Sequence, residues 1–279
     1  MNRRPRVWFV TGASSGFGRA LVEAALVHGD RVVATARRPE ALADLGADDV
    51  LVLALDVTHA DALEPALDAA VGHFGSIDVL VNNAGIGVVG ALEETSPDDL
   101  RHAMETMFFG PAALTRAVLP RMRAQGSGTI VQISSQGGRM AGPGVSAYCA
   151  AKFALEGLSE SVAAEVAPFG VRVLIVEPGN FRTGLLGRNL HAAEPMEAYA
   201  STVGAARSYF ASQDGRQEGD PAKAAAAIIT VLDAEDPPLL LVLGADAFES
   251  IRRAKETAAA ELMRWETLSR STAFTPGAA

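Results

Sequence analysis

Seven short runs of apolar residues, each followed by a stretch with helical periodicity, constrain the fold of this chain more than any other feature. The runs are continuous rather than alternating, which is typical of parallel strands buried on both faces of a sheet. The sequence therefore predicts a single-domain, doubly wound α/β fold of the Rossmann type with about seven parallel strands and helices on both faces. The predicted strands are Val7–Val10, Arg31–Ala36, Val50–Leu55, Val79–Val81, Thr129–Ile133, Val171–Val176 and Leu239–Leu243.

The segments between these runs predict six helices, and no Pro/Gly/Ser-rich linker divides the chain, so we expect one domain over residues 1–279. One long segment, Gly184–Gly219, departs from the alternation. We expect it to form a helical flap over a site, because long segments in compact domains are usually functional; a surface insertion is the alternative. The predicted helices are Phe17–His28, Asp61–Phe74, Pro97–Ala124, Val145–Pro168, Pro221–Leu232 and Phe248 to about Ser269.

Composition excludes several classes of protein. The 49% hydrophobic content supplies a sizeable core, and 33 acidic against 24 basic residues give a net charge of -9 without a basic stripe for nucleic acid. No apolar run approaches the length of a membrane helix. A single cysteine, Cys149, and five histidines without metal-ligand spacing predict a cytoplasmic protein with no disulfide and no metal site.

A glycine-rich loop, Thr11–Gly18, directly follows the first predicted strand and opens a helix. Gly12 permits a tight turn, Gly16 lets the backbone approach a pyrophosphate, and Gly18 lets helix and strand pack closely. Free N–H groups at the helix N-terminus would bind the anion, whereas a turn without a ligand is the alternative. The predicted cofactor contacts in this loop are Gly12, Ser14, Ser15, Gly16, Phe17 and Gly18.

The same loop also contains Gly12-x-Ser14-x-Gly16, the pattern of a hydrolase nucleophile elbow. Hydrolases of that fold have several strands before the elbow and place an acid and then a histidine after it. Here the loop follows the first strand, and the last histidine is His191, about two-thirds of the way along the chain. The context disfavours a hydrolase.

Charge at the ends of the next two strands indicates which dinucleotide binds. Where an acidic residue would hold a free ribose 2'-hydroxyl, the chain has Arg37 and Arg38, and a guanidinium there can bind a 2'-phosphate. The sequence therefore favours NADP(H) over NAD(H), with two solvated arginines as the alternative. Asp56 and Val57 follow the third strand, where the carboxylate could meet the adenine amino group or simply begin a helix.

Three side chains suggest catalysis. Tyr148 and Lys152 are four residues apart on one face of a predicted helix, and Ser135 ends the fifth strand. An ammonium about 4 Å away interacts with a phenolate by roughly 4 kcal/mol, so we expect Lys152 to lower the pKa of Tyr148 by up to roughly three units. Ser135 could donate a hydrogen bond to a carbonyl oxygen on which negative charge develops. Each residue alone also fits an ordinary helix or turn.

Over its first 185 or so residues the chain resembles the short-chain dehydrogenase/reductase family. The motifs occur in the order found in that family: Thr11-Gly-x-x-x-Gly-x-Gly18, Asp56, Asn82-Asn83-Ala84-Gly85, Ser135, Tyr148-x-x-x-Lys152, Pro178-Gly179 and Thr183.

The resemblance implies roles for these residues. Tyr148 would donate and accept the proton, Lys152 would lower its pKa and bind the nicotinamide ribose, and Ser135 would position the substrate oxygen. Asn83, with Ala84 and Gly85, would hold the adenosine side, and Asn82 would support the central strands. The stretch Pro178–Thr183, with Gly179 and Phe181, would cradle the nicotinamide and its phosphate.

One position departs from the pattern. The family usually carries an asparagine three residues before a glycine in the helix after the fourth strand, where it helps hold a water that links the lysine to solvent. Here that position is Met107, before Phe108-Phe109-Gly110. Methionine offers only a weak acceptor sulfur, so backbone carbonyls must hold the water, or the proton relay is slow.

The sequence thus predicts an NADP(H)-dependent oxidoreductase that transfers hydride between nicotinamide and a carbonyl or secondary alcohol. Apolar residues in the flap, including Met196, Tyr209 and Phe210, and a C-terminal likeness to hydroxysteroid and retinol dehydrogenases indicate a lipophilic substrate. The alternatives are a non-catalytic NADP-binding sensor, an NAD-preferring dehydrogenase, or an epimerase or dehydratase of nucleotide sugars, whose chains are longer. The resemblance also implies a homodimer or homotetramer, and we expect no nucleic acid or membrane partner.

Overall fold

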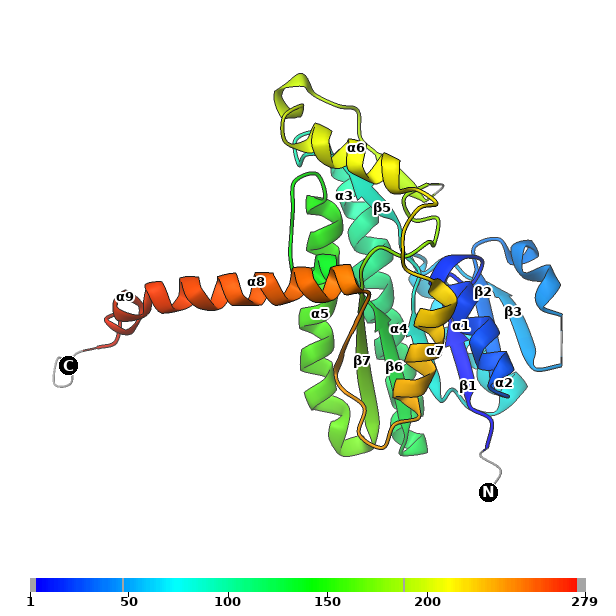
Figure 1. The fold of residues 1–279 in the computed structure, drawn as a ribbon. Coiled ribbons are helices and arrows are strands. Elements are labelled where there is room, and N and C mark those ends of the chain that lie inside the picture. Colours follow the sequence, from blue (N-terminus) through cyan, green and yellow to red (C-terminus); the bar gives the residue numbers. More distant parts are fainter. Residues whose placement is uncertain (1–3, 47, 188, 275–279) are drawn as a thin grey trace.

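The sheet at the centre of the fold contains the seven predicted strands, and all of its pairings are parallel (Figure 1). The computed structural model describes residues 4–46, 48–187 and 189–274. The predicted fold class is therefore confirmed. In spatial order the strands are β3 (Val50–Ala54), β2 (Arg31–Ala36), β1 (Val7–Val10), β4 (Val79–Asn82), β6 (Gly128–Ile133), β7 (Val171–Pro178) and β9 (Leu240–Leu243).

The strand order reverses next to β1. The chain runs outward from β1 through β2 to β3, and then returns to place β4 on the other side of β1. Connections on the two sides leave in opposite directions, so a crevice opens at the carboxyl ends of β1 and β4. The segments that follow these two strands are the glycine-rich loop and the Asn82–Gly85 stretch, and this topology brings them together.

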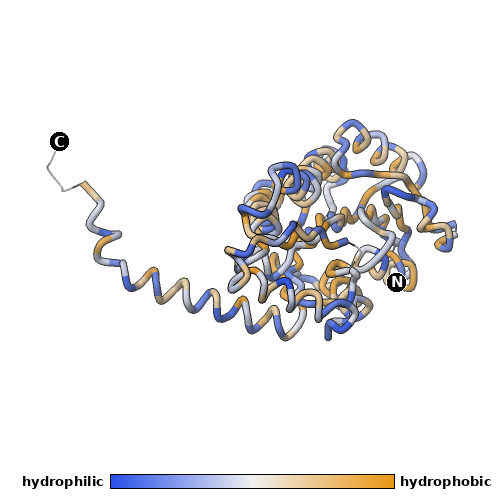
Figure 2. The backbone as a smooth tube through the Cα atoms, turned by 90° about the horizontal axis from the view of Figure 1, so that it is seen from above, coloured by the Kyte–Doolittle hydropathy of each residue, from blue (hydrophilic) through white to orange (hydrophobic). Residues whose placement is uncertain are grey.

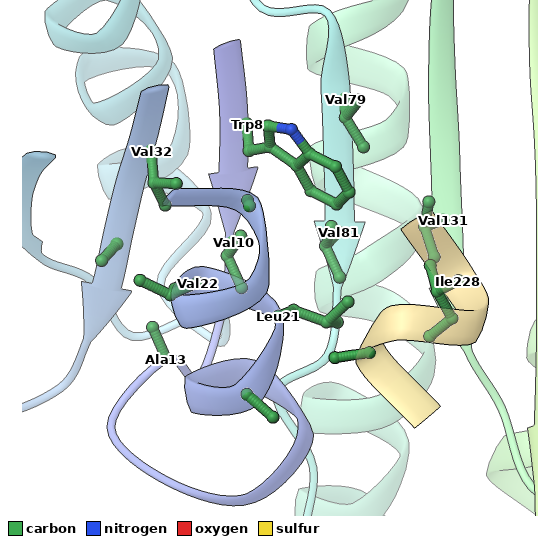
Figure 3. Close-up of a cluster of buried hydrophobic side chains, with 14 of the residues drawn as sticks. Trp8, Val10, Ala13, Leu21, Val22, Val32, Val79, Val81, Val131 and Ile228 are labelled. Atoms are coloured by element: carbon green, nitrogen blue, oxygen red, sulfur yellow. The ribbon is translucent and has the colours of Figure 1, made fainter. Parts of the chain in front are cut away.

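Both faces of the sheet are buried, which explains the continuous apolar runs. In β1, Trp8 and Val10 face one core while Val7 and Phe9 face the other. Figure 3 shows Trp8 and Val10 beside Leu21 of α1 and near Ile228 of α7. The first face is covered by α1 (Gly16–Val27) and α7 (Pro221–Leu232), and the second by α2 (Ala60–Phe74), α4 (Gly110–Gln125) and α5 (Ser146–Val166).

The prediction of one helix over Pro97–Ala124 is wrong. The structure has α3 (Pro97–Met104), a π-helical segment η2 (Glu105–Phe109) and then α4. The Gly110 N–H donates to the carbonyl of Glu105, five residues earlier, and Pro111 has no N–H to continue the α-helical pattern. Such π segments often occur at functional sites, and this one contains Met107.

Smaller differences occur at other helix ends. The predicted helix Val145–Pro168 ends at Val166 and continues as a 3₁₀ turn, η4 (Ala167–Phe169). A 3₁₀ segment, η1 (Pro39–Leu45), follows β2 and was not predicted. The C-terminal helix begins earlier than expected and breaks at Trp265, giving α8 (Ala245–Arg264) and α9 (Glu266–Arg270).

The long segment Gly184–Gly219, called the flap below, contains β8 (Leu190–Ala192), the 3₁₀ turn η5 (Glu197–Tyr199) and α6 (Val203–Gln213). In Figure 1, α6 lies above the carboxyl ends of the central strands. The sequence did not predict β8 or its parallel partner β5 (Gly87–Val89), because three residues are too few to show a period.

Candidate active site

Ser135, Tyr148 and Lys152 meet at the carboxyl end of β6. Ser135 begins the 3₁₀ turn η3 (Gln136–Gly138), where its Oγ accepts a hydrogen bond of 3.0 Å from the N–H of Gly137. The Ser135 hydroxyl lies close enough to the Tyr148 phenol to lower the pKa of that phenol. Lys152, 5% exposed, donates from Nζ to the carbonyl of Ile133 at 2.8 Å, and Nζ lies 5.9 Å from the centroid of the Tyr148 ring. The structure thus brings together the three residues that the sequence singled out.

Burial dominates the acid–base properties of this group. It raises the pKa of Tyr148 to about 12, although the nearby Ser135 hydroxyl acts in the opposite direction. It lowers the pKa of Lys152 to about 8, against the charge of Glu156. The expectation that Lys152 lowers the pKa of Tyr148 is therefore wrong here, because the low-dielectric surroundings penalise the phenolate and the ammonium is held by Ile133. At neutral pH, Tyr148 is a protonated donor.

The glycine-rich loop has the conformation that its sequence requires. Gly12 and Gly16 have φ values of +64° and +57°, which favour glycine. A Cβ on Gly18 would lie 2.4 Å from the carbonyl oxygen of Gly12, so only glycine lets α1 pack against the loop. Ser15 is the N-cap residue of α1 but makes no side-chain capping bond, and the first turn contains no acidic residue. These uncapped N–H groups, beside the exposed Ser14, fit an anionic pyrophosphate.

Asn83 fastens this loop to β4. Its Nδ2 donates to the carbonyls of Thr11 at 2.8 Å and Gly12 at 3.2 Å. The buried Thr11 hydroxyl in turn accepts from the N–H groups of Asn83 and Ala84 at 2.9 and 3.1 Å. Asn83 thus shapes the adenosine side through the loop, and Thr11, which the sequence analysis treated only as part of the motif, is the centre of the network.

Asn82 lies among the central strands, as the resemblance implied. Its Nδ2 donates to Gln132 Oε1 on β6 at 3.0 Å and to Thr115 Oγ1 on α4 at 3.2 Å. These bonds connect β4 to its neighbours below the site, and Asn82 is 3% exposed. The side chain therefore supports the sheet rather than facing the crevice.

The stretch Pro178–Thr183 folds over the glycine-rich loop. A Cβ on Gly16 would lie 2.9 Å from Thr183 Cβ, and the rings of Phe17 and Phe181 are 5.0 Å apart. Gly179 leaves no room for a side chain, because a Cβ there would be 2.3 Å from Asp246 Oδ1. Two segments about 160 residues apart in sequence therefore form the two sides of the predicted dinucleotide cradle.

Arg37 and Arg38 are exposed beyond β2, and in the described part of the chain neither forms an ion pair with a carboxylate. Burial disfavours ionisation of Asp56, but hydrogen bonds from Thr58 and the charges of His59 and Arg37 bring the Asp56 pKa below its usual value. Thr58 Oγ1 donates to Asp56 Oδ1 at 2.8 Å. Among the described residues, this edge of the sheet thus carries two exposed guanidinium groups without a salt-bridge partner.

A pocket of about 270 Å³ opens beside Arg37. It lies between β5, α3 and the flap, so this cation and the flap border the same space. The other residues of its lining are Ile86, Val88, Asp99, His102, Asn189, Leu190 and His191.

Met107 is a core residue. It is fully buried and packs with Val88, Ala103 and Ala147, and its sulfur would lie 3.8 Å from a Cβ on Gly85. The side chain therefore offers no polar group where the family usually places an amide. A water at this position would have to be held by backbone carbonyls of the π-helical segment that contains Met107.

A buried charged cluster that the sequence analysis did not find lies behind Ser135 and Lys152. Glu156, on α5, accepts a hydrogen bond from Ser134 and contacts the guanidinium of Arg139. Arg139 Nε is also 2.7 Å from Glu177 Oε1 on β7, and its Nη2 is 2.6 Å from Glu160 Oε1. Burial raises the Glu156 pKa to about 7, against the effects of Ser134 and Arg139. The available sequence signal was Glu156, one helical turn after Lys152.

The flap is fastened to the loop after β5 through Glu94, whose side chain is 1% exposed. The Glu94 carboxylate accepts hydrogen bonds from the N–H groups of Met196 and Ala91, both at 2.7 Å, and from Arg207 at 2.8 Å. These donors lower the pKa of Glu94 to about 2, so it is ionised at neutral pH. Glu94 was also missed, because nothing in sequence connects it with Arg207.

Two kinds of site are not found in residues 4–46, 48–187 and 189–274. No group of three His, Cys, Asp or Glu side chains is arranged to hold a metal ion. None of the helices in these ranges is long and apolar enough to cross a membrane.

Comparison with known proteins identifies the family. The family model for short chain dehydrogenases matches residues 6–194. The chain is 40% identical to Oxidoreductase BOA17 of Botryotinia fuckeliana over 96% of this chain and 99% of that protein. It is 37% identical to 3-ketodihydrosphingosine reductase of Bacteroides thetaiotaomicron over 86% and 88% of the two chains. The chain belongs to the short-chain dehydrogenase/reductase family and is an oxidoreductase that uses a nicotinamide cofactor.

Solved structures support the same family assignment. A short-chain dehydrogenase from Streptomyces avermitilis is 51% identical, with a TM-score of 0.92 over 98% of this chain and 100% of that one. A Burkholderia cenocepacia short chain dehydrogenase in complex with NADP is 28% identical, with a TM-score of 0.75 over 95% and 98% of the two chains.

Proposed function

We propose that this protein is an NADP(H)-dependent carbonyl reductase, or alcohol dehydrogenase in the reverse direction, that acts on a lipophilic ketone or secondary alcohol. The observation that carries the proposal is the meeting of Ser135, Tyr148 and Lys152 at the carboxyl end of β6, beside the crevice between β1 and β4. Ligands bind at this edge in open parallel sheets.

The chemistry divides between the cofactor and the protein. The nicotinamide supplies or accepts the hydride. In the reducing direction, Tyr148 gives its phenolic proton to the substrate oxygen, and its pKa of about 12 keeps that proton available at neutral pH. Ser135 donates its hydroxyl hydrogen to the same oxygen, because its Oγ already accepts from Gly137. We assign Lys152 to binding the nicotinamide ribose, which is the other role that the family resemblance implies for it.

Charge supports NADP(H) as the cofactor. The exposed Arg37 and Arg38 stand where a 2'-phosphate would lie, and no acid occupies the end of β2. The uncapped N-terminus of α1 suits the pyrophosphate. The likeness to a Burkholderia structure in complex with NADP points the same way. An NAD-preferring enzyme is the alternative.

Two observations support a lipophilic substrate. The flap presents Met196 and Tyr209, which are 39% and 47% exposed, and its helix α6 meets the loop after η3, where a Cβ on Gly144 would be 3.1 Å from Val203 Cγ1. One relative at 37% identity is named for reduction of a long-chain ketone, 3-ketodihydrosphingosine. Long-chain and bulky cyclic ketones are therefore the first compounds to test.

Cofactor choice is tested by titrating NADPH and NADH into the wild type and an Arg37→Ala variant and following cofactor fluorescence. We expect NADPH affinity to fall tenfold or more in Arg37→Ala while NADH affinity stays unchanged, because only the 2'-phosphate contacts this cation. Arg172→Ala, an exposed change on β7, is the control and should bind both cofactors as the wild type does. Equal effects on both cofactors would refute the assignment of Arg37.

Catalysis is tested with Tyr148→Phe. We expect turnover of a ketone to fall by roughly 10²–10⁴-fold, because the variant lacks the proton donor. NADPH binding should be kept, because the substitution does not change the dinucleotide cradle. Binding of NADPH by the wild type without turnover of any ketone or alcohol would favour the non-catalytic sensor instead.

A further inference from the structure

The pocket beside Arg37 is lined mainly by basic side chains. Arg37 directly follows β2, His102 lies on α3 and His191 lies on β8 of the flap, whereas Asp99 on α3 is the acidic side chain of the lining. The chain as a whole, in contrast, has a net charge of -9. The helices α8 and α9, called the arm below, leave the body on the side away from β2, so they do not cover this pocket (Figures 1 and 2).

Strand pairing holds His191 at the pocket. The strand β8 pairs in parallel with β5, and this register places His191 beside the middle residue of β5. The N–H of Gly87 donates to the carbonyl of Asn189 at 2.9 Å. A Cβ on Gly87 would lie 2.8 Å from Leu190 Cδ1, so a side chain there would crowd the flap. The flap thus brings His191 to the segment that directly follows the adenosine-side stretch Asn82–Gly85.

The acidic side chain of the pocket is already engaged. Asp99 Oδ2 accepts a hydrogen bond of 2.6 Å from the Ser96 hydroxyl, and Asp99 Oδ1 lies 3.1 Å from His191 Nε2. The bond from Ser96, together with the contact with His191, brings the pKa of Asp99 below its usual value. Asp99 therefore holds the His191 ring through Nε2, and Nδ1 is the ring nitrogen left for a ligand.

This lining fits a phosphate monoester. Guanidinium and imidazolium groups form charge-assisted hydrogen bonds with phosphate oxygens, and in the described part of the chain Arg37 forms no ion pair with a carboxylate. A ring between the Asp99 carboxylate and a phosphate must carry a hydrogen on both nitrogens, because both neighbours only accept. Ile86, which directly follows Gly85, connects the pocket to the adenosine side of the cradle.

We propose that His102 and His191 hold the 2'-phosphate of NADP(H) together with Arg37, so that the flap itself recognises this phosphate. The proposal rests on the proposed function above, which places the 2'-phosphate at Arg37. A bound 2'-phosphate joins the end of β2 to α3 and to the flap, and NAD(H) lacks the group that joins them. NADP(H) therefore fastens β8 over the site, and the two histidines add to the selectivity for this cofactor.

Cofactor affinity tests the two histidines. NADPH and NADH are titrated into the full chain and followed by cofactor fluorescence for the wild type, His191→Gln and His102→Gln. Each variant should lose about tenfold or more in NADPH affinity and nothing in NADH affinity, because a charge-assisted hydrogen bond to the 2'-phosphate is removed. Glutamine keeps a donor for Asp99, so the contact between flap and α3 is retained. His73→Gln, at an exposed position on α2, is the matched control and should bind both cofactors as the wild type does.

Two further measurements report on the flap and on the His191 ring. Hydrogen exchange at residues 190–192 should slow with saturating NADPH but not with saturating NADH, and this difference should disappear in His191→Gln. Calorimetry at pH 7.5 in buffers of different ionisation enthalpy should show more proton uptake with NADPH than with NADH. A phosphate monoester with a second pKa of about 6 is already a dianion at this pH, so the proton goes to the ring. His191→Gln should reduce this uptake.

Three outcomes would overturn this proposal and leave the proposed function intact. Wild-type NADPH affinity in His191→Gln and His102→Gln, where Arg37→Ala has lost it, would show that the flap does not contact the 2'-phosphate. Equal slowing of exchange by the two cofactors would show that the flap responds to a part that both contain. Inorganic phosphate that competes with NADPH as strongly as adenosine 2',5'-bisphosphate would assign the pocket to free phosphate. A wild type that binds neither cofactor would refute the proposed function as well.

Discussion

Lys152 and Glu156 lie one helical turn apart on the buried face of α5, and they hold two consecutive residues at the carboxyl end of β6, directly before Ser135. Lys152 donates to the carbonyl of Ile133, and Glu156 accepts from the hydroxyl of Ser134. The helix that carries Tyr148 is thus bound at two points to the strand end that carries Ser135. This connection sets the relative positions of the candidate catalytic groups.

Glu156 should make stability depend on pH. Its pKa rises from 4.5 to about 7 in the folded protein, so the protonated form is favoured there. The associated stability is complete below pH 4.5 and is lost as pH rises through about 7. Glu156→Gln removes this loss, and we expect it to be more stable than wild type at pH 8 by up to about 3 kcal/mol.

Thermal unfolding from pH 5 to 8 measures this effect. The control is Glu160→Gln, a half-exposed partner of Arg139 on the same helix, which should follow the wild-type pH curve. Parallel curves for Glu156→Gln and wild type would show that the Glu156 carboxylate is not destabilised by burial.

Arg139 should be essential for stability. Its replacement by Met leaves Glu156 and Glu177, which are 2% and 0% exposed, without their shared cation. We expect a loss of about 3–5 kcal/mol in the free energy of unfolding by urea. Arg121→Met, which removes a surface arginine paired with Glu64 and Asp68, should cost about 1 kcal/mol or less. Similar losses for the two variants would contradict a special role for the buried cluster.

Gly18 should control cofactor binding through the shape of the loop. In Gly18→Ala the new Cβ would meet the Gly12 carbonyl at 2.4 Å and Asn83 Nδ2 at 2.5 Å, so the loop must shift. We expect NADPH affinity to fall at least tenfold in a calorimetric titration. In Gly72→Ala on α2, the added methyl meets nothing within 4 Å, and affinity should be unchanged. Wild-type affinity in Gly18→Ala would show that the loop tolerates the side chain.

Glu94 should hold the flap over the site. We expect Glu94→Gln to weaken the contact with Arg207 and raise hydrogen exchange across residues 190–199, with a higher KM for a lipophilic ketone and unchanged NADPH affinity. Glu93→Gln is the comparison, because Glu93 accepts an exposed hydrogen bond of 2.7 Å from the Tyr199 hydroxyl of the flap and lacks the buried bonds that Glu94 makes. Exchange rates that are the same in both variants would place the fastening of the flap elsewhere, in the β5–β8 pairing.

Met107→Asn tests the proton relay. An amide among Val88, Ala103 and Ala147 lacks partners and should cost about 1–3 kcal/mol of stability. We nevertheless expect its turnover number to exceed that of wild type, because the amide can hold a water near Lys152. Met107→Leu keeps the volume without the polar group and should turn over as wild type does. A turnover number for Met107→Asn no higher than for Met107→Leu would show that the relay is not limiting.

The sequence by itself determined the sheet, the glycine-rich loop and the positions of Ser135, Tyr148 and Lys152 in the order of the chain. Each of these leaves a local pattern: an apolar run, a glycine spacing, or two polar residues one helical turn apart. A continuous apolar run predicts a parallel strand buried on both faces of a sheet, and the ends of the run mark the ends of the strand. The predicted bounds of the seven strands therefore differ from the observed ones by at most two residues at either end.

Only the tertiary structure decided the pKa of Tyr148, the partners of Glu94, Arg139 and Thr11, and the course of the arm. Burial depends on what the rest of the chain places around a group, and it raised the pKa of Tyr148 where the sequence predicted a lower one. Arg139 and Glu177 are 38 residues apart, and Glu94 and Arg207 are 113 apart, so no local pattern records their contacts. The π-helical segment at Met107 likewise arises where Gly110 packs against Val57, a contact between distant parts of the chain.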